Sequence, residues 1–165
     1  MNTVRTESGP LCGLVNAAGI YPVTPFISLE LDEWDQVLNT NLRGAFIIAQ
    51  WVAQTMIEDQ VQGAIINVTS TSATFCRPGV AHYGASKAGL TQLTRDMALE
   101  LAEYGIRVNA ITAGMTSTRF HDDFTSDDNR FPLSLSLLIV LSITNLSLTL
   151  SLIFLFGFLI LLLKF

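Results

Sequence analysis

The sequence predicts an α/β fold in which a partial, doubly wound parallel sheet of three strands is connected by two long helices. Short apolar runs at 11–15, 64–68 and 106–112 have the length of strands buried in a parallel sheet. Between them, the segments from about 30 to 62 and from 82 to 104 place apolar residues along one helical face. Strands and helices therefore alternate, which favours parallel strands joined by right-handed crossovers.

Composition divides the chain into four segments. A polar leader covers residues 1–10, the α/β domain covers 11–118, and a polar linker covers 119–130. The remaining residues, 131–165, form an apolar tail rich in Leu, Ser and Phe. The leader has no apolar stretch, so we expect no signal peptide.

Charge and cysteine content exclude several classes of protein. The net charge is −5 and there is no basic run, so nucleic acid is not an expected partner. Cys12 and Cys76 are far apart and form no CxxC pattern, which indicates two reduced thiols in a cytoplasmic protein. His82 and His121 are expected to be exposed. His121 adjoins two aspartates in the linker but lacks ligand spacing, so we predict no metal site.

Polar groups with acid–base chemistry follow the predicted strands. Tyr83 and Lys87 are four residues apart near the start of a helix, so their side chains share a face. A phenol has an ordinary pKa of about 10, and a neighbouring ammonium is expected to lower this pKa. The positive field of the helix N-terminus acts in the same direction. Such a tyrosine can exchange a proton with a substrate oxygen at neutral pH.

Two further polar residues complete this candidate site. Ser70 ends a predicted strand, where ligands of parallel sheets bind, and its hydroxyl can hold the same oxygen. Asn41 lies on the apolar stripe of the first helix, where an amide needs a partner, and we expect it to hold a water or the lysine. Each residue taken alone also has a structural interpretation: a strand-end cap for Ser70, a helix kink for Asn41 and a solvated lysine for Lys87. The hydroxyls that compete with Ser70 belong to Thr69, Thr71 and Ser72.

Five motifs, in order, resemble the short-chain dehydrogenase/reductase family. They are NAAG at 16–19, NLRGAF at 41–46, INVTS at 66–70, YGASKAG at 83–89 and RVNAITAG at 107–114. Within the family the chain looks most like bacterial-type 3-oxoacyl carrier-protein reductases and sugar or dihydrodiol dehydrogenases. The resemblance implies a partial Rossmann-like sheet, an NAD or NADP cofactor, and hydride transfer with a small-molecule carbonyl or secondary alcohol. It also implies that full-length relatives form homo-oligomers.

The resemblance assigns roles to the catalytic residues. It implies that Ser70 binds the carbonyl and that Tyr83 is the acid–base. It further implies that Lys87 holds the nicotinamide ribose and depresses the tyrosine pKa, and that Asn41 completes a proton relay.

The same resemblance assigns the cofactor contacts. Gly114 and Thr118 belong to the stretch that contacts the nicotinamide carboxamide, although Ala113 stands where the family usually has proline. The residues expected to shape the sheet beside the adenosine end are Asn16, Ala17, Ala18 and Gly19.

The glycine-rich phosphate-binding unit of the family has no counterpart in this sequence. The segment 8–13 is superficially similar, but no strand precedes it, no helix follows, and Val15 occupies the third glycine position. The choice between NAD and NADP, and the choice of substrate, are therefore left open. We expect the first retained strand to be an exposed apolar edge, and the polypeptide alone to fold poorly and to have little or no activity.

The tail has two interpretations. Residues 146–163 meet the length and polarity test for a membrane span, and Arg119 and Arg130 favour a cytoplasmic N-terminal side. Alternatively, the alternating Leu-Ser pattern is typical of translated pyrimidine-rich non-coding DNA, and a period of two is not what helix packing requires. The sequence favours the second interpretation. The alternative to an enzyme is accordingly a non-catalytic, tail-anchored fragment or pseudoenzyme.

Overall fold

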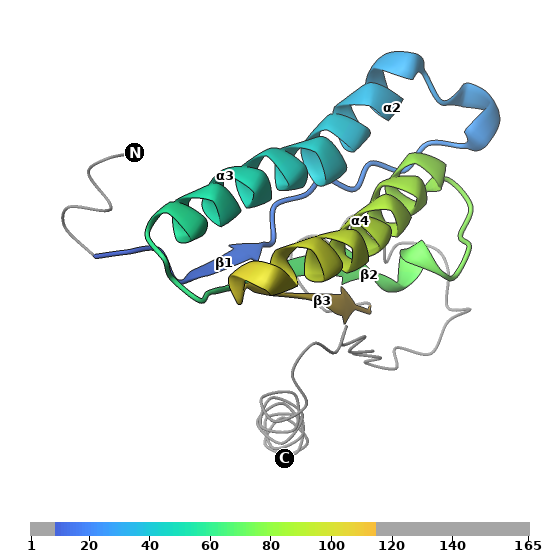
Figure 1. Cartoon of the computed structure of the whole chain (residues 1–165). Coiled ribbons are helices and arrows are strands. Elements are labelled where there is room, and N and C mark those ends of the chain that lie inside the picture. The colour runs from blue at the N-terminus through green and yellow to red at the C-terminus, as the bar shows by residue number, and fades with distance from the viewer. Residues whose placement is uncertain (1–8, 115–165) are drawn as a thin grey trace, which may run out of the picture.

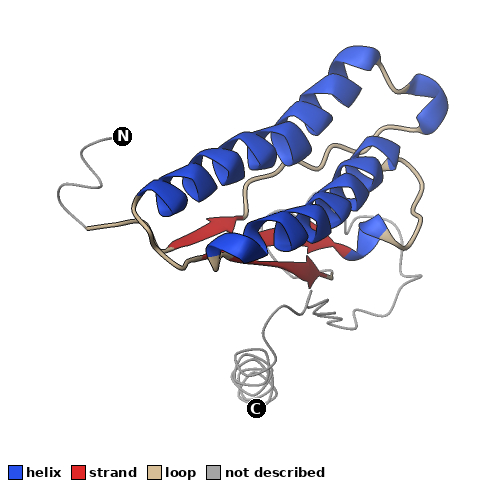
Figure 2. Ribbon diagram, viewed as in Figure 1, coloured by secondary structure: helices blue, strands red, loops and turns tan. Residues whose placement is uncertain are grey.

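The computed structural model describes residues 9–114, and these residues form a three-stranded parallel sheet covered by helices on one face (Figure 2). The strands are β1 (Gly13–Asn16), β2 (Ala64–Ser70) and β3 (Arg107–Ala113), in the spatial order β1-β2-β3. Both strand pairs are parallel. The predicted fold class, a partial Rossmann-like α/β sheet, is confirmed.

Two long helical segments connect the strands. The first consists of α2 (Leu31–Leu38), a π-helical turn (Asn39–Arg43) and α3 (Gly44–Glu58), which follow one another without a break (Figure 1). The second is α4 (Ala81–Glu100), which ends in a 3₁₀ turn (Leu101–Tyr104). Short 3₁₀ turns also occur at Phe26–Ser28, ahead of α2, and at Thr71–Ala73, after β2.

The first helical segment is shorter than the sequence predicts. It ends at Glu58, and Gln60 adopts a positive φ of 56° in the turn that follows. Gly63 lies beside the end of α3, close to Met56 and Cys12. A Cβ at this position would lie 2.5 Å from the Met56 sulfur and 3.0 Å from the Cys12 carbonyl oxygen.

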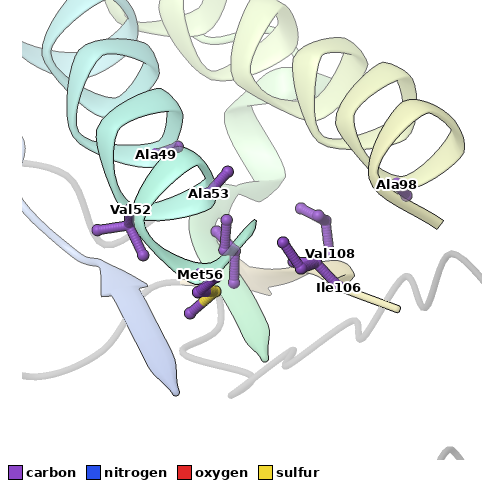
Figure 3. Packing of buried hydrophobic residues seen from close by; sticks show 8 residues of the cluster. Ala49, Val52, Ala53, Met56, Ala98, Ile106 and Val108 are labelled. Carbon is purple, nitrogen blue, oxygen red and sulfur yellow. The ribbon is translucent and has the colours of Figure 1, made fainter. Parts of the chain in front are cut away.

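The hydrophobic core lies between the sheet and the two long helices (Figure 3). α3 packs against β1, and α4 packs against β2 and β3. Alternate strand residues face this core, as the period of two in a strand requires. The buried cluster consists of Ala49, Val52, Ala53, Met56, Ile65, Ala98, Ile106 and Val108.

β1 forms one edge of the described sheet, as predicted. It pairs only with β2 among the strands in residues 9–114, and the Val15 side chain is 61% exposed. An apolar edge of this kind can pair with another chain.

Several sequence-based predictions fall on residues that the structure does not describe. The linker 119–130, the apolar tail 131–165 and Thr118 all lie outside the described residues. Between residues 9 and 114, no helix is both long enough and apolar enough to cross a membrane. Within that range, no three His, Cys, Asp or Glu side chains are grouped to hold a metal.

Candidate active site

The candidate site lies at the carboxyl ends of the strands, where the loop after β2 meets the first turn of α4. Ser70 is the last residue of β2 and pairs in register with Ala113 of β3. Its hydroxyl oxygen accepts a hydrogen bond from the Ser72 backbone N–H at 3.1 Å and so caps the following 3₁₀ turn. The strand-end cap expected from the sequence is therefore present, and this bond also fixes the position of the hydroxyl.

Lys87 is a buried residue of α4 rather than a solvated one. Its side chain is only 4% exposed, and Nζ donates a hydrogen bond to the Val68 carbonyl oxygen of β2 at 2.8 Å. The same Nζ lies 5.8 Å from the centroid of the Tyr83 ring, one turn earlier on the helix. The ammonium is thus held between the sheet and the tyrosine.

Tyr83 joins the serine and the lysine in one cluster. The Ser70 side chain lies close enough to the Tyr83 phenol to lower its pKa. The Tyr21 ring packs edge-on against the Tyr83 ring, with 4.4 Å between centroids and an interplanar angle of 88°. The structure therefore brings together three predicted site residues, Ser70, Tyr83 and Lys87. The Tyr21 ring, which the sequence did not predict to be near the site, packs against one side of the Tyr83 ring.

The expected direction of the Tyr83 pKa was wrong. Burial raises the pKa of Tyr83 above its usual value, the Ser70 hydrogen bond and the charge of Arg77 lower it, and Tyr21 raises it. Burial also lowers the pKa of Lys87. Removal of the phenol from water outweighs the effects of Ser70 and of the Arg77 charge, so the described arrangement favours the protonated phenol.

A tyrosine titration tests this direction. Because folding raises the pKa of Tyr83, the protonated phenol contributes stability below pH about 10, and this contribution is lost as the pH rises through the folded pKa. We expect tyrosinate absorbance to show one residue titrating above the ordinary value of about 10, and this component to disappear in Tyr83→Phe. The sequence has three tyrosines, so the difference spectrum is readily assigned. A Tyr83 component that titrates below the ordinary value would contradict the assignment.

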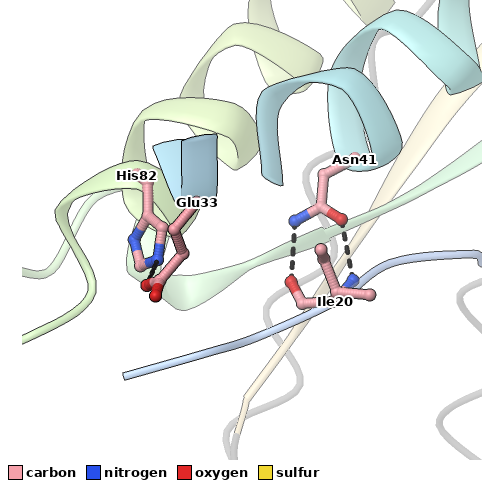
Figure 4. A network of polar contacts seen from close by, with 4 residues as sticks. All are labelled: Ile20, Glu33, Asn41 and His82. Atoms are coloured by element: carbon pink, nitrogen blue, oxygen red, sulfur yellow. Dashed lines mark hydrogen bonds and ion pairs between the residues drawn. The ribbon is translucent and has the colours of Figure 1, made fainter. Parts of the chain in front are cut away.

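Asn41 is buried in the π-helical turn and binds the chain after β1 (Figure 4). Its Oδ1 accepts from the Ile20 backbone N–H at 2.8 Å, and its Nδ2 donates to the Ile20 carbonyl at 2.9 Å. Nδ2 also lies 3.2 Å from the Ser86 hydroxyl oxygen, to which it donates. Among the described groups the amide therefore holds Ile20 and Ser86.

The segment after β1 passes close to this polar cluster. A Cβ at Gly19 would lie 3.2 Å from Asn41 Oδ1 and 3.6 Å from Lys87 Nζ, so the absence of a side chain allows the close approach. Ala17, Ala18 and Gly19 are exposed at the carboxyl end of β1.

Asn16 and Gly114, two residues expected near the cofactor, occupy different settings. Asn16 donates to the Asn67 side chain at 2.8 Å and to the Ala45 carbonyl at 3.3 Å, which ties β1 to β2 and α3. Asn16 thus connects the edge strand to its neighbours through its side chain. Gly114 is half-buried directly after β3.

His82 is buried, whereas the sequence predicts an exposed histidine. Its side chain is fully buried because α2 packs against α4. Its Nε2 lies 3.0 Å from Glu33 Oε1 (Figure 4). Since no local pattern links residues 49 positions apart, only its place next to Tyr83 could have drawn attention to it.

Comparison with known proteins agrees with this geometry. A family model described as short chain dehydrogenase matches residues 1–129. The chain is 39% identical over 119 residues to carbonyl reductase [NADPH] 2 of Sus scrofa, covering 72% of this chain and 49% of that protein. It is 42% identical over 115 residues to a 3-oxoacyl-[acyl-carrier-protein] reductase of Thermotoga maritima, covering 70% and 46%.

Solved structures of dehydrogenases also match the chain. A gluconate 5-dehydrogenase from Burkholderia cenocepacia, in complex with NADP and tartrate, superposes with a TM-score of 0.71 at 34% identity. That match covers 76% of this chain and 49% of the solved one. A 4-hydroxyisoleucine dehydrogenase complexed with NADH and succinate gives a TM-score of 0.65 at 37% identity, covering 69% and 53%.

Ser70 at the end of β2 and Tyr83 and Lys87 in α4 thus lie together at the carboxyl end of a parallel α/β sheet. The chain belongs to the short-chain dehydrogenase/reductase family. It spans about half the length of the curated relatives that it matches.

Proposed function

We propose that this chain carries the acid–base half of an NAD(P)-dependent oxidoreductase that interconverts a small-molecule carbonyl and a secondary alcohol. The observation that supports it most is the cluster itself: the Ser70 side chain lies near enough to the Tyr83 phenol to lower its pKa, and the Lys87 ammonium is 5.8 Å from the centroid of the phenol ring. The family's named members are dehydrogenases and reductases, which is consistent with this chemistry.

Each residue of the cluster has a role in the proposal. The Ser70 hydroxyl hydrogen-bonds the substrate oxygen and orients it toward the phenol. Tyr83 gives its proton to that oxygen during reduction and takes a proton from the alcohol during oxidation. A bound nicotinamide supplies or accepts the hydride. The raised pKa of Tyr83 suits the protonated phenol that reduction requires.

Lys87 and Asn41 support the proton transfer in this proposal. An ammonium has three N–H donors, and the described structure uses one of them on Val68, which leaves two for the hydroxyls of a nicotinamide ribose. Asn41 supports the relay indirectly, because it fixes the Ile20 backbone and Ser86 beside the lysine. In this proposal the exposed carboxyl end of β1, where Gly19 lies near Lys87 Nζ, borders the cofactor.

The hydrogen-bond donors that the 165-residue polypeptide offers to the cofactor determine how tightly it can bind NADH. Lys87 can hold the ribose, but the sequence has no glycine-rich turn with a helix N-terminus behind it to bind the pyrophosphate. We therefore expect NADH to bind the purified polypeptide much more weakly than micromolar, with Lys87→Met weaker still. NADH fluorescence measures both constants, and micromolar affinity of the unmodified polypeptide would contradict the expectation.

A non-catalytic role is the second candidate, and the open edge of β1 with its exposed Val15 favours it. A non-catalytic chain would show no turnover for a Tyr83 substitution to remove.

We also propose a cytoplasmic location unless residues 146–163 form a genuine span. Alkaline carbonate extraction tests the span: recovery in the soluble fraction would remove the anchor.

A further inference from the structure

Glu33 and His82 connect the first turns of two helices beside the candidate site (Figure 4). Glu33 is the third residue of α2, and His82 is the second residue of α4. The Glu33 carboxylate oxygen lies 3.0 Å from His82 Nε2, the imidazole is fully buried, and the Glu33 side chain is 30% exposed. The bond therefore crosses between helices where water has little access to the imidazole.

The start of α4 depends on contacts of this kind. Its N-cap residue, Val80, makes no side-chain capping bond, so the usual fixation of a helix start is missing. His82 immediately precedes Tyr83, and the first turn of α4 therefore carries the phenol. An anchor on His82 consequently restrains the backbone from which Tyr83 reaches Ser70.

The chemistry of the pair selects the tautomer of a neutral ring. An ionised carboxylate only accepts hydrogen bonds, so a neutral His82 must carry its proton on Nε2 and donate it to Glu33. The other nitrogen, Nδ1, is buried and has no hydrogen-bond partner within residues 9–114. Within these residues, the bond to Glu33 is thus the polar contact that holds the imidazole.

We propose that Glu33 and His82 form a positioning pair: their hydrogen bond holds the first turn of α4 against α2 and thereby keeps the Tyr83 phenol on the Ser70 hydroxyl. Neither residue touches the reacting atoms in this account. The effect on turnover rests on the proposed oxidoreductase function, whereas the effect on the geometry of Tyr83 does not.

Substitutions at Glu33 test the pair through kinetics. Glu33→Ala removes the acceptor, and a displaced phenol is expected to lower kcat by about a hundred-fold while the KM for NAD(P)H stays unchanged. Glu33→Gln keeps an amide oxygen that accepts from Nε2, and should restore most of the activity. The control is Asp32→Ala, because Asp32 is an exposed acidic residue in the same first turn of α2. Equal kcat in Glu33→Ala and Asp32→Ala would overturn the proposal.

Nuclear magnetic resonance on the full chain tests the pair without turnover. The sequence has two histidines and three tyrosines, so His82 and Tyr83 are assigned by the single variants His82→Gln and Tyr83→Phe. We expect the Nε2–H tautomer at His82 in the unmodified chain. In Glu33→Ala, but not in Glu33→Gln, the ring resonance of Tyr83 should move and its titration should shift toward that of free tyrosine.

The outcomes separate the two proposals. A Tyr83 resonance that responds to Glu33→Ala, in a chain whose Tyr83 and Lys87 signals do not respond to NADH, supports the positioning pair and refutes the proposed function. An Nδ1–H tautomer, or a Tyr83 resonance identical in the unmodified chain and in Glu33→Ala, overturns the pair whatever the activity. If Glu33→Ala does not fold, the positioning pair is tested by the His82 tautomer in the unmodified chain and by the Tyr83 resonance in Glu33→Gln.

Discussion

Replacing Tyr83 by phenylalanine is expected to lower kcat by about 10²- to 10⁴-fold, the usual contribution of a general acid–base group. The substitution removes only the hydroxyl, whose pKa the neighbouring Ser70 lowers, and leaves the ring that packs against Tyr21. Because the aromatic packing is kept, the folded structure and the affinity for NAD(P)H should change little. Steady-state kinetics with a carbonyl substrate, together with cofactor titration of the same variant, measure the two quantities.

The matched control for this substitution is Tyr104→Phe. Tyr104 is 46% exposed and lies in the 3₁₀ turn at the opposite end of α4, far along the helix from Ser70. It should leave kcat unchanged. If Tyr83→Phe retained full turnover, the assignment of Tyr83 as the acid–base would be refuted, whatever its effect on stability.

Replacing Asn41 by alanine is expected to lower the free energy of unfolding by about 2–4 kcal/mol, because it leaves the Ile20 N–H and carbonyl without their partner. Asn41 is fully buried, so water cannot easily replace its amide. The segment that carries Tyr21 onto Tyr83 would also loosen, and turnover should fall together with stability. Urea denaturation of the full chain measures the first effect.

Asn39→Ala provides the control for Asn41. Asn39 belongs to the same π-helical turn but is exposed, so its replacement should change the free energy of unfolding by less than about 0.5 kcal/mol. Equal destabilisation by the two substitutions would show that the π-helical turn, and not the amide of Asn41, is what stabilises the segment.

The sequence was informative wherever a local period or a strand end determined the structure. Apolar runs located all three strands within two residues, and the strand–helix alternation predicted their parallel arrangement. The spacing of Tyr83 and Lys87, one helical turn apart, was enough to place them on one helix face near the end of β2, whereas the family resemblance selected Ser70 among the competing hydroxyls there. Parallel strands direct such residues to one edge of the sheet, so no long-range information was required.

The sequence was uninformative where the outcome depended on contacts between distant segments. The burial of His82 follows from the packing of α2 on α4, and the Tyr21–Tyr83 contact joins residues 62 positions apart. The direction of the Tyr83 pKa was wrong for the same reason. A nearby ammonium is visible as a spacing, whereas the removal of water from the phenol depends on the whole neighbourhood.

The central claim is that Ser70, Tyr83 and Lys87 face a nicotinamide. The most direct measurement is a nuclear magnetic resonance titration of the full chain with millimolar NADH and, separately, with adenosine monophosphate, which lacks the nicotinamide. The side-chain signals of Tyr83 and Lys87 should shift with NADH and stay in place with adenosine monophosphate. Signals of both residues that remain unchanged while NADH shifts other parts of the chain would contradict the account.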